Sequence, residues 1–593
     1  MRRIVCLAIL GALGAFAQAL PVAAASDTLV SVGSPTTPFP QSWQNTPAVA
    51  VDPAHPSVLA ATAIDTLDAA ACSAWDDPAF CPFGRVGLDG VYFSFDGGSS
   101  WTQPTYTGLT RRHCLGPAEC QLTLDDLSGG LEIGPIGTVP NHYQAGLFST
   151  SDPVVAFGPA PGPDGAFSWD NGSRLYHTHR VQEFDPDSPW FKPAVNGGTA
   201  VGLSRIDGAP ALTPQIVADQ ANWMPPVVVR EKRSENDWLV AGEFGTSVWA
   251  DNAESSPNFG HVYFCGASSR EDLDGGIVST QIVLDVSADG GTTWDGRNVS
   301  RASSRRGGRA GCLVRTDSEG TVYLFWNEGF LDDREVVTMT RSFDGGRSFE
   351  KPRAILDAVH CGTLQELQID GVMGAGGSPL ASVDIANGAP SGGNASDQLV
   401  LTICDGSRGI NAIRALVISS TDHGKSWSEP VDAAQAGDRP NLPTIAISPD
   451  GEDVYLVYLG FLDPWRESLS GSRRVQAVVL HADASNLSTW AALHRGVIAD
   501  ARAATAMSGG GRQFGYLGAT SAAAAARDGA ILLWTDIRNA ERCPAIEAYR
   551  QSIVDDEESP LPPPAVNSDC PPRFGNSDIY GTSVADPTPS ATR

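Results

Sequence analysis

The stretch that decides the fold is SFDGGSSW at residues 94–101. It follows the pattern Ser-x-Asp-x-Gly-x-Ser/Thr-aromatic, and three more copies occur along the chain: SADGGTTW at 287–294, SFDGGRSF at 342–349 and STDHGKSW at 420–427. Each copy comes directly after a run typical of a strand, such as VYF at 91–93 and ALVI at 415–418. Because the same turn recurs after successive strands, the pattern predicts a repeated antiparallel sheet.

The residue types of this pattern suit a tight hairpin turn. The glycine can adopt a positive φ without a steric penalty. The aspartate can accept hydrogen bonds from the N–H groups of the turn, and the aromatic residue is expected to pack back against the hairpin. We therefore expect a structural role for the four aspartates of the pattern, which are Asp96, Asp289, Asp344 and Asp422.

Two further signatures mark the other strands. Runs such as PAVAVDP at 47–53 and PTIAISPDG at 443–451 predict an inner strand, and runs ending in an aromatic residue, such as TVYLFW at 321–326, predict the next strand. These units begin near residues 45, 150, 225, 308, 375, 440 and 514, and no linker divides them. The sequence predicts one all-β domain over 45–554, a β-propeller of four-stranded antiparallel blades. Seven blades are favoured, and six are the alternative.

The two ends of the chain are expected to lie outside this domain. Arg2 and Arg3 precede an apolar run over 4–20, and three alanines at 23–25 form a small-residue cleavage site. Residues 1–25 therefore predict a signal peptide cleaved near Ala25, a secreted extracellular protein, and no membrane span in the mature chain. Residues 26–44 are expected to be a lead-in. Residues 555–593, acidic and then proline-rich, are expected to be a C-terminal tail.

The cysteines agree with export. Eleven are present, and ten remain once Cys6 is removed with the signal peptide. Pairing of sequence neighbours predicts five disulfides: Cys72–Cys81, Cys114–Cys120, Cys265–Cys312, Cys361–Cys404 and Cys543–Cys570. No pair has the histidine spacing of a zinc site, so we expect no metal site and no required cofactor. Acidic loops could hold calcium, although no motif demands it.

The charge balance excludes some partners. The chain has 40 basic and 68 acidic residues and a formal net charge of −28. A nucleic-acid binder needs a basic face, so nucleic acid is not an expected partner. We expect a monomer whose partner is an extracellular glycan or glycoprotein.

The repeated turn resembles the Asp-box (BNR) repeat of the sialidase superfamily. The stretches WADNAESSP at 249–257 and WTDIRN at 534–539 are similar to segments of secreted bacterial "sialidase family" proteins. The resemblance implies a propeller in which each Asp box closes the turn between the third and fourth strands of a blade. It also implies an exo-acting glycoside hydrolase that acts on extracellular glycans.

The resemblance further implies a site with three arginines that hold a carboxylate, a tyrosine nucleophile paired with a glutamate, and an aspartate acid/base. The first arginine is expected in an Arg-Ile-Pro motif on the first blade, but NTPAV at 45–49 has no arginine, so this triad is not recognisable. The catalytic candidates are Glu328, Arg334, Arg414, Tyr516, Asp536 and Arg538. The substrate-binding candidates, arginines for an anion and tryptophans for sugar rings, are Trp75, Arg85, Arg408 and Trp465.

Two alternatives to a glycoside hydrolase stay open. One is a non-catalytic secreted or surface propeller that binds glycan or protein, which the missing first-blade arginine favours. The other is a polysaccharide lyase, for which His113 and His142 are the available histidines.

Overall fold

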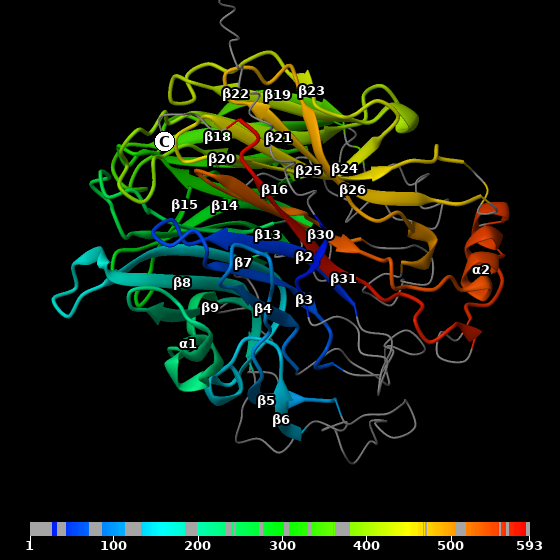
Figure 1. Ribbon diagram of the computed structural model, residues 1–593, viewed down its shortest axis with the longest axis horizontal. Coiled ribbons are helices and arrows are strands. Elements are labelled where there is room, and N and C mark those ends of the chain that lie inside the picture. The colour runs from blue at the N-terminus through cyan, green and yellow to red at the C-terminus, as the bar shows by residue number, and fades with distance from the viewer. Residues whose placement is uncertain are drawn as a thin grey trace, which may run out of the picture.

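A computed structural model describes residues 26–31, 43–69, 86–112, 132–183, 199–231, 239–240, 245–271, 277–301, 308–329, 334–359, 361, 380–466, 468, 471–504, 517–556, 559–564 and 569–588. Within these residues, seven antiparallel sheets are arranged in a ring (Figure 1). The protein is a seven-bladed β-propeller, as the strand signatures predict, and the six-bladed alternative is wrong. The first strands of successive blades contact each other around the whole ring.

The first six sheets follow one another along the chain, and we number them as blades 1 to 6. Blade 1 contains β2 (Gln44–Val51), β3 (Leu59–Asp65) and β4 (Asp89–Ser94); blade 2 contains β7 (Leu147–Pro161), β8 (Phe167–Glu183), β9 (Thr199–Gly208) and β10 (Val227–Glu231). Blade 3 contains β11 (Leu239–Val240), β12 (Ser247–Ala250), β13 (Val262–Glu271), β14 (Ile277–Ser287) and β15 (Asp295–Asn298). Blade 4 contains β16 (Arg309–Thr316), β17 (Val322–Glu328), β18 (Arg334–Ser342) and β19 (Arg353–Val359); blade 5 contains β20 (Ser382–Ile385), β21 (Leu399–Asp405), β22 (Arg414–Ser420) and β23 (Val431–Asp432). Blade 6 contains β24 (Arg439–Ile447), β25 (Asp453–Phe461), β26 (Arg474–Asp483), β27 (Ala491–Arg495) and β28 (Ala499–Asp500).

Blade 7 closes the ring by joining the two ends of the chain. It contains β29 (Ala522–Ala526), β30 (Gly529–Asp536), β31 (Asp578–Ala585) and, as its outer strand, β1 (Thr28–Leu29). The expectation that 555–593 is a tail is therefore wrong for β31, and the lead-in supplies β1. The physical reason is burial, because Ile579 and Val584 of β31 pack in the core and the proline-rich stretch before them hides the strand pattern.

One predicted blade start is also wrong. The run VVVRE of β10 suggests an inner strand near residue 225, but β10 pairs with β9 as the outer strand of blade 2. The inner strand of blade 3 is β12, which begins at Ser247. A short run that begins with three valines looks the same in an inner and an outer strand, so the residue pattern alone does not separate them.

A hairpin and a few helices stand outside the sheets. The hairpin of β5 (Tyr106–Thr110) and β6 (Glu132–Ile136) follows blade 1, and the helix α1 (Pro214–Ala218) lies between β9 and β10. The longer helix α2 (Pro544–Asp555) lies in the connection from β30 to β31, at the outer side of the ring (Figure 1). None of the helices in the described part of the chain is long and apolar enough to cross a membrane.

Each Asp box forms the turn after the third strand of its blade. In the first box, the Asp96 carboxylate accepts the Ser100 N–H at 2.9 Å, the Ser100 hydroxyl at 2.6 Å and the Ser94 hydroxyl at 2.9 Å. The same bonds recur around Asp289, Asp344 and Asp422. The hydrogen bonds expected from the pattern are therefore present in all four copies.

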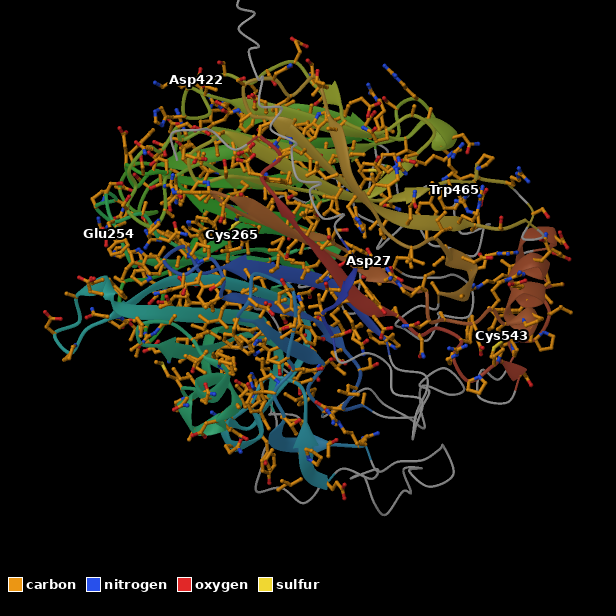
Figure 2. All side chains as sticks on the ribbon, in the orientation of Figure 1. Asp27, Glu254, Cys265, Asp422, Trp465 and Cys543 are labelled. Atoms are coloured by element: carbon orange, nitrogen blue, oxygen red, sulfur yellow. A yellow bond between two sulfur atoms is a disulfide. The ribbon has the colours of Figure 1, made fainter. Side chains whose placement is uncertain are left out.

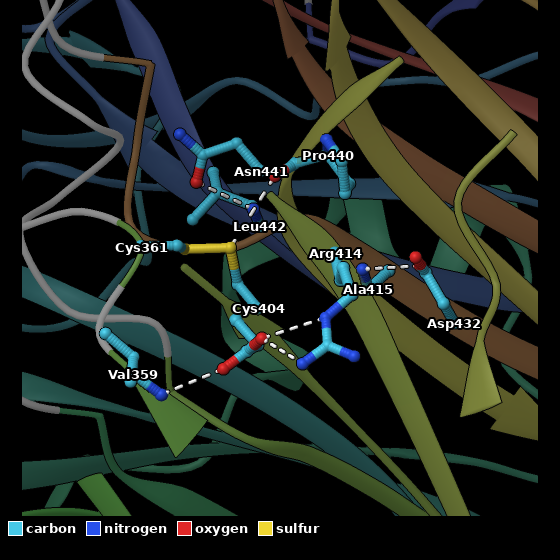
Figure 3. Close-up of a disulfide and its surroundings, with 10 residues drawn as sticks. Val359, Cys361, Cys404, Arg414, Ala415, Asp432, Pro440, Asn441 and Leu442 are labelled. Atoms are coloured by element: carbon cyan, nitrogen blue, oxygen red, sulfur yellow. Dashed lines mark hydrogen bonds and ion pairs between the residues drawn. A yellow bond between two sulfur atoms is a disulfide. The ribbon is translucent and has the colours of Figure 1, made fainter. Parts of the chain in front are cut away.

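Three of the five predicted disulfides form. Cys265–Cys312 joins blade 3 to blade 4, Cys361–Cys404 ties the end of blade 4 to blade 5 (Figure 3), and Cys543–Cys570 spans the loop that carries α2. The pairs Cys72–Cys81 and Cys114–Cys120 lie outside the described residues, as do the signal peptide and its cleavage site.

Candidate functional site

The inner strands of the seven blades line a central channel of about 1110 Å³. Every blade contributes to the wall, for example through Thr46, Asp152, Thr246, Leu313, Ser382, Leu442 and Thr520. A cavity of this size lies at the upper end of the range for small-ligand sites. The channel is therefore the candidate functional site.

A repeated bulge shapes the end of the channel at which the inner strands begin. Thr46, Asp152 and Leu442 each have a positive φ, between 52° and 58°, and each is followed by a proline. The pairing of the inner strand shifts register at each of these places. Glycines with positive φ take the corresponding position at Gly245, Gly311 and Gly518. Non-glycine residues rarely adopt this backbone, and bulges re-aim side chains at the ends of sheets.

The channel wall is acidic. Among the described residues, the carboxylates of the lining are Asp152, Asp384, Asp450, Glu452 and Asp528, and the arginines are Arg315 and Arg527. With five acidic residues and two arginines, the described residues of the lining carry a formal charge of −3.

Arg315, in β16 of blade 4, contacts residues of blades 3 and 5. Its Nε lies 3.1 Å from Asp384 Oδ1, and its guanidinium lies 4.6 Å from the centre of the Trp249 ring. The Trp249 indole N–H in turn donates to Thr316 Oγ1 at 2.8 Å. Burial raises the pKa of Asp384, and the charge of Arg315 opposes that rise. Arg315 is therefore part of an ion pair that the blade packing fixes.

Arg527, which directly follows β29, is bound in a similar way. Its Nη1 lies 3.5 Å from Asp450 Oδ2, and its Nη2 donates to the Gly388 carbonyl at 3.2 Å. Both arginines of the described lining thus have a carboxylate partner. A cluster of arginines that could grip a substrate carboxylate is not formed by the described residues of the channel.

Among the described catalytic candidates, the structure pairs Asp536 with Arg538 but does not gather the candidates at one site. Arg414 binds Asp405 with Nη2–Oδ2 at 2.6 Å (Figure 3), and Glu328 accepts from Arg309 Nε at 3.0 Å. Arg538 binds Asp536 with Nη2–Oδ2 at 2.6 Å. None of these six side chains lines the channel. Tyr516 and the side chain of Arg334 lie outside the described residues.

The substrate-binding candidates are equally dispersed. Trp465 is only 8% exposed, because the Arg473 guanidinium covers its ring at 3.6 Å from the centre. It therefore presents no open face to a sugar. Arg408 is exposed, and Trp75 and Arg85 lie outside the described residues.

A buried carboxyl group behind the channel wall was not predicted. Asp89, at the start of β4, is fully buried, and neither of its carboxylate oxygens has a hydrogen-bond partner among the described residues. Burial, reinforced by the charge of Asp152, raises the pKa of Asp89 well above its usual range, and the neighbouring Ser149 opposes this effect. Asp152 itself lines the channel. A single aspartate before the apolar run VYF is the only sequence signal for this group.

Three histidines form a second buried group between blades 1 and 2. His142 Nε2 lies 2.6 Å from His179 Nε2, and His179 Nδ1 lies 2.8 Å from His177 Nδ1. Burial lowers the pKa of His142 to about 4 and that of His177 to about 3. His142 is one of the two histidines considered for a lyase, and it does not line the channel, whereas His113 lies outside the described residues.

Comparison with known proteins gives only structural matches. No protein-family model matches the chain, and no curated protein matches it. The chain is similar to a Hadza microbial sialidase (16% identity, TM-score 0.35, 66% of this chain) and spans 64% of that protein's length. It is similar to the phage phi92 endosialidase (11% identity, TM-score 0.39, covering 96% of this chain and 70% of that one). It is also similar to an ulvan lyase (11% identity, TM-score 0.34, covering 65% and 79%). The solved structures that it resembles thus include sialidases and a polysaccharide lyase.

Proposed function

We propose that the protein is an extracellular glycan-binding propeller that takes an uncharged part of a glycan into its central channel. The main support for this proposal is the negative charge of the channel wall. Its described residues include five carboxylates and two arginines, and the arginines are already paired with Asp384 and Asp450. A sialic acid would bring its own carboxylate into this negative field. A bidentate contact from a free arginine is the usual compensation for such a charge.

The neutral groups of the wall support a sugar as the ligand. Amides and hydroxyls lie among the carboxylates and include Asn252, Asn327, Asn387, Ser382 and Thr520. Sugar hydroxyls both donate and accept hydrogen bonds, so this mixture of donors and acceptors suits them. Trp249 and Trp326 also belong to the lining.

The test is a binding measurement on pairs of glycans that differ only in a terminal sialic acid. We expect the uncapped member of at least one pair to bind with saturation and its sialylated partner to bind at least tenfold more weakly. Stronger binding of the sialylated members throughout would contradict the proposal.

A matched pair of variants sharpens this test. Asp384→Asn removes the partner of Arg315 and should bring sialylated and uncapped glycans closer in affinity. Asp170→Asn removes an exposed carboxylate outside the channel and should leave the preference unchanged. Equal behaviour of the two variants would mean that the Arg315–Asp384 pair does not set the preference.

A second candidate function is hydrolysis of such a glycan, and Asp89 and Asp152 favour it. Burial and the charge of Asp152 raise the pKa of the Asp89 carboxyl group, and Asp152 lines the channel. Acid/base hydrolysis uses two carboxyl groups, of which one keeps its proton. The test is release of sugar from neutral fluorogenic glycosides between pH 4 and 8. Turnover that falls at least a hundredfold in Asp152→Asn but not in Asp170→Asn would support hydrolysis, and background turnover on all substrates would leave binding as the function.

A further inference from the structure

A mixed group of metal-ligating side chains lies at the junction of blades 6 and 7. Asp453 comes from β25, His481 from β26, and Asp586 directly follows β31. One donor atom from each lies within 4.8 Å of the others, and all three residues are buried. No other group of three His, Cys, Asp or Glu donors in the described part of the chain converges in this way.

Regular backbone structure holds each of the three donors. In blade 6, β25 and β26 pair along their length, and this pairing places His481 Nε2 2.9 Å from Asp453 Oδ1. The Asp453 N–H donates to Ser448 Oγ at 3.0 Å, which fixes the start of β25. In blade 7, the Asp586 N–H donates to the Asp528 carbonyl at 2.9 Å. The site is thus assembled from two blades and does not depend on a loose loop.

We propose that Asp453, His481 and Asp586 bind one divalent transition-metal ion of the Zn²⁺ or Mn²⁺ class. One imidazole nitrogen and two carboxylate oxygens suit these ions, with water completing the coordination. Calcium is less suitable because it takes six to eight oxygen ligands. With metal–donor distances of about 2.0–2.2 Å, the donor atoms of a tetrahedral site lie about 3.3 Å from one another, a spacing that the three side chains reach by small rotations.

The ion would act as a cross-link next to the closure of the ring. The outer strand of blade 7, β1, pairs with β31 over the short ladder of Thr28 and Leu29, and Val30 and Ser31 add hydrogen bonds to Ile579. A metal that joins the end of β31 to blade 6 adds a second fastening, because Asp586 is then bonded to Asp453 and His481. This role is independent of glycan binding, since the three side chains do not line the channel.

The simpler occupant of the site is a proton. A protonated His481 would form an ion pair with Asp453 and leave Asp586 as a neighbour rather than a ligand. The two cases differ in whether Asp586 is required. A metal site needs all three donors, whereas the ion pair needs only His481 and Asp453. Asp586 is therefore the residue to change.

The experiment uses the mature protein after dialysis against EDTA, titrated calorimetrically with ZnCl₂, MnCl₂ and CaCl₂. We expect one equivalent of Zn²⁺ or Mn²⁺ to bind, a rise in the unfolding temperature on binding, and at least tenfold weaker binding of Ca²⁺. Asp586→Asn should weaken binding of the transition metal at least tenfold. Asp170→Asn, which removes an exposed carboxylate in blade 2, should bind the metal as the wild type does.

Two further readouts keep the test decisive. Co²⁺ at the site should give a visible absorption band that is lost in His481→Gln, and circular dichroism should show that this variant is folded. Absence of stoichiometric binding by the folded wild type would overturn the proposal. So would binding that is unchanged in both Asp586→Asn and His481→Gln.

Discussion

The Nε2 atoms of His142 and His179 face each other at 2.6 Å inside the contact between blades 1 and 2. A ring nitrogen at this distance from another needs a hydrogen between them. The chain continues through His177 to the Thr62 hydroxyl, which donates to the Gly90 carbonyl at 2.7 Å. At the other end, His142 Nδ1 lies 3.0 Å from the Pro140 carbonyl. Both ends of the chain are therefore hydrogen-bond acceptors.

This arrangement leaves the neutral chain one hydrogen short. It has five links, but three neutral imidazoles and one hydroxyl supply four hydrogens. One added proton would complete the chain. Burial opposes protonation because it lowers the pKa values of His142, His177 and His179, and repulsion between the histidines adds to this effect at His177 and His179. The histidines consequently tie folding stability to pH.

The first prediction is that stability falls as the solution is acidified from about pH 6.5 towards pH 4. Below the unfolded pKa of about 6.5, the unfolded histidines bind protons that the folded ones do not, so acid favours unfolding. Each such histidine contributes a slope of about 1.4 kcal/mol per pH unit. Urea unfolding of the wild type and His177→Gln at several pH values measures the slope. The slope of unfolding free energy against pH should be smaller in the variant by the amount that one bound proton contributes. Equal slopes would show that the pKa of His177 is not lowered in the folded protein.

The second prediction concerns Asp251, which follows β12 and is fully buried. Its Oδ1 has no hydrogen-bond partner among the described residues, and burial raises its pKa to about 7. A raised carboxyl pKa means that stability is present below about pH 4 and is lost as the pH rises towards 7. Asp251→Asn should therefore gain stability relative to the wild type over this interval, on the order of 4 kcal/mol from the size of the shift. Thermal unfolding at pH 4.5 and pH 7.5 checks this, and a constant difference between the two proteins would contradict it.

The third prediction concerns the Asp boxes. Asp344→Ala removes the acceptor for the Ser348 N–H, the Ser348 hydroxyl and the Ser342 hydroxyl. We expect a loss of about 1–2 kcal/mol in the free energy of unfolding, with ligand binding per folded molecule unchanged. Denaturant unfolding together with glycan binding on the folded fraction measures both. A collapse of binding in fully folded variant would show that the box is not only structural.

The fourth prediction concerns Asp27, which ties the N-terminal segment to blades 6 and 7 (Figure 2). Its carboxylate lies 2.6 Å from His494 Nε2 and accepts from Arg538 Nη2 and the Val497 N–H. Burial raises the pKa of Asp27, but the bonds from His494 and Arg538 outweigh it, so the net pKa is lowered. Asp27→Asn should cost about 1–3 kcal/mol of stability, whereas Asp170→Asn should cost less than about 0.5 kcal/mol. Chemical denaturation of both variants tests this prediction. Equal denaturation midpoints would show that the contacts of Asp27 do not stabilise the closed ring.

Local features of this protein could be predicted from the sequence because their contacts are short in range. The hydrogen bonds of an Asp box join residues of the same short segment, as those of Asp96 with Ser94 and Ser100 do. The local sequence therefore determines the turn. Strands such as β17 and β25 are likewise visible in the sequence as short apolar runs, because nearly all of their residues are buried. Neighbouring cysteines, as in Cys361–Cys404, pair because adjacent blades lie side by side.

The tertiary structure decided everything that depends on which distant residues meet. Whether an arginine is available to a ligand depends on its partner, and Arg315 meets Asp384 from the next blade, 69 residues away. The strand β31 belongs to the ring because it pairs with β30 along its length, and β1 from the other end of the chain then pairs with β31. The same closure gathers Asp453, His481 and Asp586, and blade packing joins Thr62 to His177. Sequence patterns do not predict these long-range contacts. The energy of an ion pair or a buried hydrogen bond depends on distance and on the exclusion of solvent, and only the folded ring determines both.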